Sequence, residues 1–324
     1  MTNIRAHVDG PVASTAAAPS QPRRRRRGAA VLAAVALGGV GSVGSLIGTT
    51  AGAAVPATAP AIACHGSMVG EQLNEPVVGI ANTADQNGYW LVASDGGVFN
   101  FGDAGFYGSA GNITLNKPIV GMATTTDGKG YWLVASDGGV FSYGDAQFYG
   151  SAGNIQLNKP VVGMAATADG KGYWLVASDG GVFSYGDAQF HGSAGNIQLN
   201  EPVVGIARTA DGNGYWLAAA DAGVFSYGDA SYLGGGPVSQ DGGPIVTDFN
   251  AFAATDDGTG YILANSDAGF LLNFGTAKYY GLGTSYAFSL AGVTSPASAA
   301  GYGYWEATGS GIVYALTASG VAAC

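Results

Sequence analysis

Short apolar runs separated by glycine-containing turns make up most of the chain. Residues 173–177 are apolar at every position and rich in aromatic and β-branched side chains, which favours a strand over a helix. Residues 178–181 follow with an Asp-Gly step that supplies the positive φ angles of a tight hairpin turn. We expect residues 160–165 to form the first strand, and residues 182–185 and 189–191 the third and fourth. The pattern predicts four short antiparallel strands in 42 residues.

The same unit occurs six times. Its Gly-Tyr step begins at residues 88, 130, 172, 214, 260 and 303, so successive copies are 42, 42, 42, 46 and 43 residues apart. The central strand lacks the apolar–polar alternation of a sheet with one wet face, which indicates that both faces are covered. Units of this size that cover one another on two sides are typical of propeller blades. We predict an all-β fold, a six-bladed β-propeller over residues 66–324.

The longer interval between the fourth and fifth copies indicates a loop insertion. It breaks the symmetry of the ring, and we take it as the candidate loop for ligand specificity. Its candidate residues are Gly234, Gly235, Gly236, Gln240 and Asp241. The fifth copy also has one extra residue before Phe274, which we interpret as a β-bulge in the third strand.

The two ends of the repeat array fall at the same point of the cycle. Residues 66–76 match residues 192–202, so Cys64 takes the place of Phe190, and Cys324 falls at the end of the same predicted strand in the last copy. A closed ring needs its last blade to meet its first, whereas an open stack has no reason to end in phase. A lone cysteine pair in an exported protein is usually bridged. We predict a Cys64–Cys324 disulfide, and two unpaired thiols are the alternative.

The first 53 residues have the layout of a secretory signal. Residues 23–27 are five arginines, residues 28–48 are uncharged and apolar, and small residues surround Ala53. We expect a disordered leader that is cleaved near Ala53, followed by a linker over residues 54–65. The rival interpretation is an uncleaved helix, because 21 residues can just span a bilayer. In that case the leader alone would attach the protein to a membrane.

Removal of the leader makes an already acidic protein more acidic. The whole chain has 12 basic and 22 acidic residues, and residues 1–53 hold six arginines and Asp9, which leaves six basic and 21 acidic residues and a net charge of −15. Such a charge disfavours nucleic acid and anionic membrane surfaces as partners. It suits a soluble protein that is secreted or held at the cell surface.

No catalytic, metal-binding or cofactor-binding set is recognisable. Outside the leader the histidines are His65 and His191, and His191 stands where sister copies have tyrosine, as an ordinary strand residue would. His65 adjoins Cys64, but a single Cys-His step is a weak metal signal. Gly-x-Ser-x-Gly, the signature of a nucleophile elbow, does not occur.

Aspartates recur at three positions of the unit and could form a ring that binds calcium or acts as a general acid. Each adjoins or shares a turn with glycine, however, where aspartate bonds to its own backbone, so a structural role in the turns is favoured. No spacing resembles a calcium-binding loop. The three sets are Asp85, Asp127, Asp169, Asp211 and Asp257; Asp95, Asp137, Asp179, Asp221 and Asp267; and Asp103, Asp145, Asp187 and Asp229.

Aromatic residues could stack on sugars. The tryptophans stand mid-strand among apolar neighbours, so we expect them in the core between blades. Tyrosines near the blade edges are better candidates for exposed ligand-binding aromatics. The tryptophans are Trp90, Trp132, Trp174, Trp216 and Trp305, and the tyrosines are Tyr107, Tyr149, Tyr232 and Tyr280.

The stretch VVGMAATADGKGYWLVASDGGVFSY, residues 161–185, resembles propeller blades of the WD40 and quinoprotein-like kind. More closely, GYWLVASDGGVFSYGDA resembles the repeats of secreted actinobacterial proteins, in which such arrays stand alone or accompany exported hydrolases, amidases or peptidases. The resemblance implies a propeller fold and names no substrate. The Trp-Asp dipeptide of many WD40 blades is absent, and the quinone-binding residues cannot be mapped, so no cofactor is expected.

We expect an exported binding or scaffold module at the cell surface or outside the cell, in preference to an enzyme. Its ligand would be a glycan, a cell-wall polymer or a protein, bound by loops at one end of the ring. One alternative is a secreted hydrolase of the esterase, glycosidase or amidase type without a recognisable catalytic set. Another is a purely structural surface protein.

Overall fold

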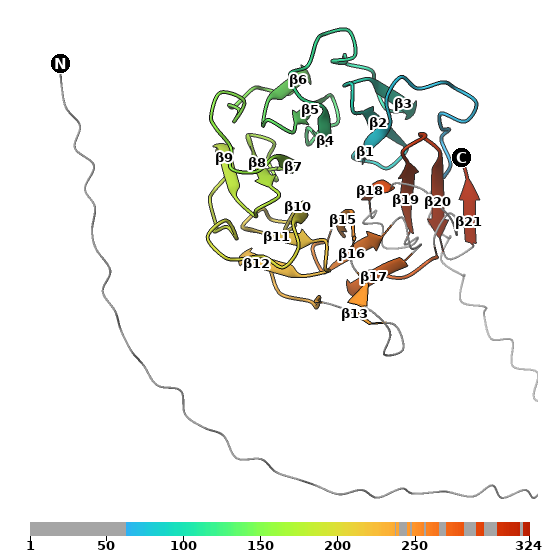
Figure 1. The fold of residues 1–324 in the computed structure, drawn as a ribbon. Helices are drawn as coiled ribbons and strands as arrows, with labels where there is room; N and C mark the ends of the chain where they lie inside the picture. The colour runs from blue at the N-terminus through green and yellow to red at the C-terminus, as the bar shows by residue number, and fades with distance from the viewer. Residues whose placement is uncertain are drawn as a thin grey trace, which may run out of the picture. The chain divides into compact units, whose positions relative to one another are not determined.

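A computed structural model describes residues 63–236, 238–239, 245–246, 248–255, 257–265, 270–281, 290–294, 303–317 and 320–324. Within these ranges the chain forms β-strands and no helix, so none of the described segments is a helix that could cross a membrane. Six antiparallel sheets surround a common centre (Figure 1). The predictions for the leader and for most of the linker lie outside the described residues.

Each of the first four blades is a sheet of three strands. They are β1 (Val77–Asn82), β2 (Gly88–Ala93) and β3 (Val98–Gly102); β4 (Ile119–Thr124), β5 (Gly130–Ala135) and β6 (Val140–Gly144); β7 (Val161–Ala166), β8 (Gly172–Ala177) and β9 (Val182–Gly186); and β10 (Val203–Arg208), β11 (Gly214–Ala219) and β12 (Val224–Gly228).

The last two blades contain the diverged copies of the repeat. The fifth blade has three strands and the sixth has four, and a small hairpin precedes the fifth. They are β13 (Val238–Ser239) and β14 (Ile245–Val246) in the hairpin; β15 (Ala251–Ala254), β16 (Gly260–Asn265) and β17 (Phe270–Gly275); and β18 (Leu290–Thr294), β19 (Gly303–Thr308), β20 (Val313–Thr317) and β21 (Gly320–Ala323).

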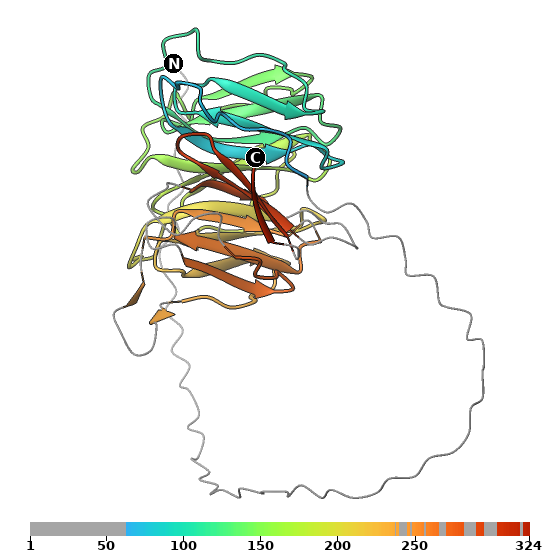
Figure 2. The same ribbon diagram turned by 90° about the vertical axis from the view of Figure 1, so that its right-hand side faces the viewer.

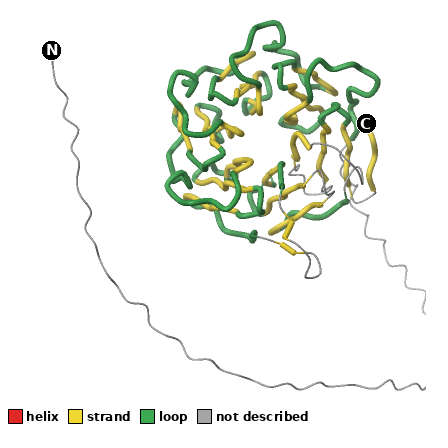
Figure 3. The backbone as a smooth tube through the Cα atoms, in the orientation of Figure 1, coloured by secondary structure: helices red, strands yellow, loops and turns green. Residues whose placement is uncertain are grey.

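The blades close into a ring. The first strand of each blade is innermost and contacts the first strand of the next, in the order β1, β4, β7, β10, β15 and β18, and β18 contacts β1 again. Figure 3 shows these strands around the centre of the ring, and Figure 2 shows the blades from the side. The predicted six-bladed β-propeller is confirmed.

The middle strand of each blade forms the core. Trp174 and Tyr173 on β8 are fully buried, and the Trp174 ring packs against Tyr215 of the next blade with 5.5 Å between ring centroids. An aromatic side chain buries about 150–250 Å², worth about 4–6 kcal/mol at about 25 cal/mol per Å² before the entropic cost of ordering it. The solid apolar run of this strand therefore fills the space between neighbouring blades, and the predicted core role of the tryptophans is confirmed.

The predicted fourth strand is wrong for the first five blades. In the third blade its backbone groups bond to side chains instead of joining a ladder: Trp174 Nε1 donates to the carbonyl of Gln189 at 2.7 Å, and His191 N–H donates to the Tyr215 hydroxyl at 3.2 Å. That hydroxyl in turn donates to the carbonyl of Gly192 at 2.6 Å. We call this arrangement the Trp–Tyr clasp. Because it occupies the backbone groups that a ladder would need, residues 189–191 form no strand.

The sixth blade differs because both ends of the array meet there. Strand β21 pairs with β20 as a true fourth strand. Residues 63–66 accept the hydrogen bonds of the Trp–Tyr clasp in this blade. Trp305 Nε1 donates to the carbonyl of Ala63 at 3.2 Å, and the Tyr89 hydroxyl of the first blade donates to the carbonyl of Gly66. Cys64 and Cys324 form a disulfide with their Cα atoms 5.0 Å apart. The predicted disulfide is confirmed.

Backbone geometry supports one turn prediction and corrects the predicted bulge. Gly180, in the turn between β8 and β9, has φ +80°, and a Cβ atom there would lie 2.5 Å from the Ala194 side chain. The pairing of β16 with β17 is regular from Gly260 to Asn265, so the predicted bulge is absent from the described part of the third strand.

Candidate binding surfaces

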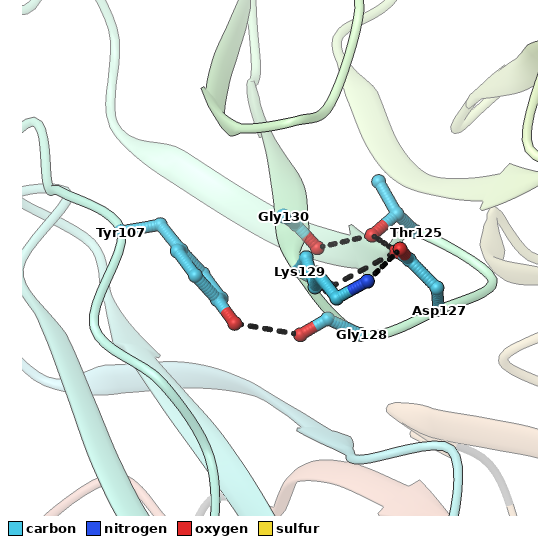
Figure 4. Close-up of polar contacts among 6 residues, drawn as sticks. All are labelled: Tyr107, Thr125, Asp127, Gly128, Lys129 and Gly130. Atoms are coloured by element: carbon cyan, nitrogen blue, oxygen red, sulfur yellow. Dashed lines mark hydrogen bonds and ion pairs between the residues drawn. The ribbon is translucent and has the colours of Figure 1, made fainter.

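In the first five blades the turn between the first two strands contains an aspartate. In the second blade (Figure 4) the Thr125 hydroxyl lies 3.1 Å from Asp127 Oδ1, which also accepts the Lys129 N–H at 3.2 Å. The Tyr107 hydroxyl from the preceding blade donates to the carbonyl of Gly128 at 3.1 Å. Asp127 therefore holds the shape of the turn, as predicted for this set of aspartates.

Hydrogen bonds keep these exposed carboxylates ionised. The Lys129 ammonium, 3.0 Å away, lowers the pKa of Asp127 to about 2, and Lys171 does the same for Asp169. The backbone N–H of Asn213 lowers the pKa of Asp211 to about 2. A general acid needs a pKa near the working pH. These carboxyl groups are therefore unsuited to proton donation near neutral pH.

The four described aspartates of the second set are also structural, and Asp267 lies outside the described residues. The Oδ1 atom of each accepts the N–H of the glycine two residues further on, at 2.9 to 3.0 Å. These aspartates are Asp95, Asp137, Asp179 and Asp221. In the third set, Asp145 and Asp187 lie near the ammonium groups of Lys129 and Lys171. Within the described ranges no three His, Cys, Asp or Glu side chains come together as a metal site would require.

A cavity of about 570 Å³ opens at one mouth of the ring. It is lined by the ends of the innermost strands and by the turns that follow them, with threonine, alanine, Asn82 and Gln86 side chains. Arg208 supplies a positive charge, and its Nη1 donates to the carbonyls of Thr209 and Ala210 at 2.9 Å each. The described lining contains no carboxylate. The described lining is thus polar and includes one positively charged side chain.

The opposite part of the central channel is smaller, and its described side chains are apolar apart from Asn250. Its cavity of about 270 Å³ is lined by the beginnings of the innermost strands, including Val77, Met164 and Phe252. Ile80 and Met122 border both cavities. The polar site of the channel therefore lies at the mouth that carries Arg208.

A groove of about 590 Å³ separates the second and third blades on the same face as the first turns. Asp145, Gln147 and Tyr149 line one side, and Asp169 and Lys171 line the other. The Tyr149 hydroxyl donates to the carbonyl of Gly170 at 3.1 Å, which ties the two sides together. The groove has mixed charge and its polar groups already bond to one another, so it is a weaker candidate than the channel mouth.

The two histidines fill equivalent places in the Trp–Tyr clasp. The His191 ring lies 5.5 Å from Tyr215 and 6.3 Å from Trp174, and the His65 ring lies 5.8 Å from Tyr89, measured between centroids. The Nε2 atom of each is buried and has no hydrogen-bond partner among the described residues. Both histidines pack between blades. The predicted strand position of His191 is wrong, because residues 189–191 form no strand.

The aromatic side chains that are exposed in the structure differ in part from those predicted. Tyr107 and Tyr149 are half-buried with bonded hydroxyls, and Tyr280 is also half-buried. Tyr232 is exposed, with its hydroxyl 3.1 Å from the carbonyl of Gly235. Sequence reasoning missed four rings that are about as exposed as Tyr232 and occupy the same position of the unit. These are Phe106, Phe148, Phe190 and Tyr279.

The candidate specificity loop is described only in part. The carbonyl of Gly234 accepts a hydrogen bond from the Tyr261 hydroxyl at 2.5 Å, just as the carbonyl of Gly192 accepts one from the Tyr215 hydroxyl. The Gly236 N–H donates to the carbonyl of Ala222 at 2.7 Å. Gly234, Gly235 and Gly236 thus belong to the scaffold beside the β11–β12 turn, at the end of β11 opposite Arg208. Gln240 and Asp241 lie outside the described residues. A ligand-binding role for this loop stays a prediction.

The comparisons with known proteins bear on the fold. No protein-family model and no curated protein sequence matches the chain. A β-propeller domain of Cps50 (Swd1) from Myceliophteria thermophila is similar in structure, with a TM-score of 0.48, 8% identity, and 72% of this chain and 80% of that chain covered. A structural-genomics protein of unknown function from Bacteroides thetaiotaomicron has a TM-score of 0.52 and 14% identity, with 78% and 72% covered. At such identities the likeness concerns fold alone.

Proposed function

We propose that the protein is an exported binding module whose ligand enters the channel mouth that carries Arg208. The observation that carries the proposal is the 570 Å³ cavity, which combines one arginine with threonine hydroxyls and the Asn82 and Gln86 side chains. Concave sites with a few convergent polar groups are where proteins usually bind small ligands or the ends of larger ones.

The ligand class follows from the lining. Amide, hydroxyl and guanidinium groups bond to hydroxyls and carboxylates, the groups that glycans and cell-wall polymers display. An exposed loop or terminus of a protein offers the same chemistry. We favour the terminal sugar or acid group of a glycan or cell-wall polymer, because the cavity admits a chain end more readily than a flat protein surface.

Location outside the cell is part of the proposal. The basic and apolar leader and the likeness of the repeats to secreted actinobacterial arrays support export. The Cys64–Cys324 disulfide supports it more weakly, because disulfides persist in oxidising compartments.

Glycan-array binding and calorimetry on residues 54–324 test the proposal. Arg208→Gln and Thr124→Val both alter the cavity lining and should each weaken binding of the best array ligand. Lys171→Gln removes a positive charge outside the cavity and should leave binding unchanged. Thermal melting of each variant separates lost binding from lost folding. Full affinity in both cavity variants, or turnover of esterase or glycosidase substrates by the wild type, would contradict the proposal.

A further inference from the structure

One outward position of the repeat carries an aromatic side chain in five places around the ring. It lies in the outer segment that follows the third strand of each blade. Its occupants expose nearly the same fraction of their surface, between 58% and 61%. They are Phe106, Phe148, Phe190, Tyr232 and Tyr279, and we call them the rim aromatics.

The backbone on both sides of a rim aromatic is held by the Trp–Tyr clasp. At Phe148 the preceding carbonyl, of Gln147, accepts Trp132 Nε1 at 2.7 Å. The following N–H, of Tyr149, donates to the Tyr173 hydroxyl at 3.2 Å. The clasp therefore fixes where the exposed ring stands, so a ligand that stacks on it need not order a loose loop.

The aromatic character persists where the repeat has diverged. In the fifth blade Ile262 replaces the clasp tryptophan, and the hairpin has an extra residue, yet Tyr279 still occupies the rim position. In the sixth place the equivalent residue is Cys64, which forms the disulfide. The position is phenylalanine in three copies and tyrosine in two. Both side chains have the same flat ring face and differ only at the ring edge, so a ligand that stacks on the face could bind either one.

Isolated exposed rings fit sugar better than protein. Protein interfaces use contiguous apolar patches of several hundred Å². Each rim aromatic belongs to a different blade. The residue before it is small or polar, such as Gly105 and Gln147, and the residue after it is half-buried, such as Tyr107 and Tyr149. A single ring face can cover the C–H face of one pyranose, and a net charge of −15 outside the leader disfavours polyanions.

We propose that the rim aromatics are five separate stacking sites for the pyranose rings of a neutral polysaccharide. The inference rests on the proposed role as a binding module, but it uses the rim instead of the channel mouth. Each contact is weak alone. Several contacts to one polymer or one insoluble surface raise the overall affinity by about 10²–10⁴-fold through effective concentration.

Retention of residues 54–324 on insoluble cellulose and on chitin tests this proposal. The triple variant Phe106→Ser, Phe148→Ser and Phe190→Ser should lose about tenfold or more in partition to whichever polysaccharide retains the wild type. The matched control replaces three other exposed apolar residues of the same repeats, Ile113, Ile155 and Ile197, which are 48–49% exposed. That control should be retained as the wild type is.

A second variant guards against misfolding. Phe148→Tyr with Phe190→Tyr keeps the ring faces and should retain binding, and melting curves confirm that every variant is folded. Absence of wild-type retention on both polysaccharides, or equal retention of the serine triple variant, would overturn the proposal. If the serine triple variant loses self-association but is still retained on the polysaccharide, the rim aromatics contact protein, and this result would also overturn the proposal. Arg208→Gln should not alter retention, so failure at the rim and failure at the channel mouth are distinguishable.

Discussion

Replacement of both cysteines by serine should weaken the ring at the sixth blade without opening it. The disulfide joins residues 260 positions apart in the sequence. On the chain-entropy model a loop of that length corresponds to about 5–6 kcal/mol at 25 °C, and measured effects commonly reach only about 2–5 kcal/mol. Non-covalent contacts remain at the same place, including Trp305 with Ala63 and the Met68 N–H with the carbonyl of Gly311 at 2.9 Å.

We therefore expect C64S/C324S to be folded at 25 °C and less stable by about 2–5 kcal/mol. Guanidinium unfolding followed by tryptophan fluorescence measures this difference, because all five tryptophans are buried in the native ring. Addition of a reductant should bring the wild type to the midpoint of the variant and should leave the variant unchanged. An unchanged midpoint in the double variant would refute the idea that the bond stabilises the closed ring.

Two further predictions concern the clasp and the turns. Tyr173→Phe removes a hydroxyl that bonds to two backbone groups, so it should lower the free energy of unfolding in chemical denaturation by about 1–3 kcal/mol. The control Tyr185→Phe should change it little, because the Tyr185 hydroxyl has no hydrogen bond among the described residues, and equal losses in the two variants would contradict the role of the clasp. The pKa values of Asp127 and Asp169 are lowered from 3.8 to about 2 in the folded state, so their contribution to stability is present above about pH 4 and is lost as the pH falls through about 2. Denaturation midpoints across this range should fall less steeply in the Asp127→Asn, Asp169→Asn variant than in the wild type; parallel curves would refute the assignment.

The sequence predicted most of the fold because the repeat is regular. The apolar run at residues 173–177 and the Asp-Gly turn after it gave the middle strand and its hairpin, since strand length and turn chemistry are local properties. The phase shared by Cys64 and Cys324 predicted closure, because only a ring requires its ends to coincide.

The absence of a fourth strand in the first five blades could not be predicted from such local properties. A short extended segment looks the same in sequence whether its backbone bonds to a neighbouring strand or to side chains. At residues 189–191 the partners are Trp174 and Tyr215, and the second of these lies in the next blade. Pattern reasoning sees spacing along the chain and has no means of assigning such a contact between blades.

The candidate sites were less predictable than the fold. Sequence reasoning assigned exposure to Tyr107 and Tyr149 and missed Phe106 and Phe148, because in an extended segment adjacent residues point to opposite sides and nothing local says which side faces outward. The sequence also did not mark Arg208 as a candidate binding residue, because its place in the channel depends on how the innermost strands come together.

The sharing of one blade by residues 63–66 and residues 320–324 has a consequence for biogenesis. A ribosome has to produce about 260 residues between the two partners before that blade can be completed. Until then the Tyr89 side of the first blade lacks Trp305 and the rest of the sixth blade as its neighbour, so the ring cannot close. Closure of the ring is therefore a late step of folding, and the covalent part of that closure requires an oxidant.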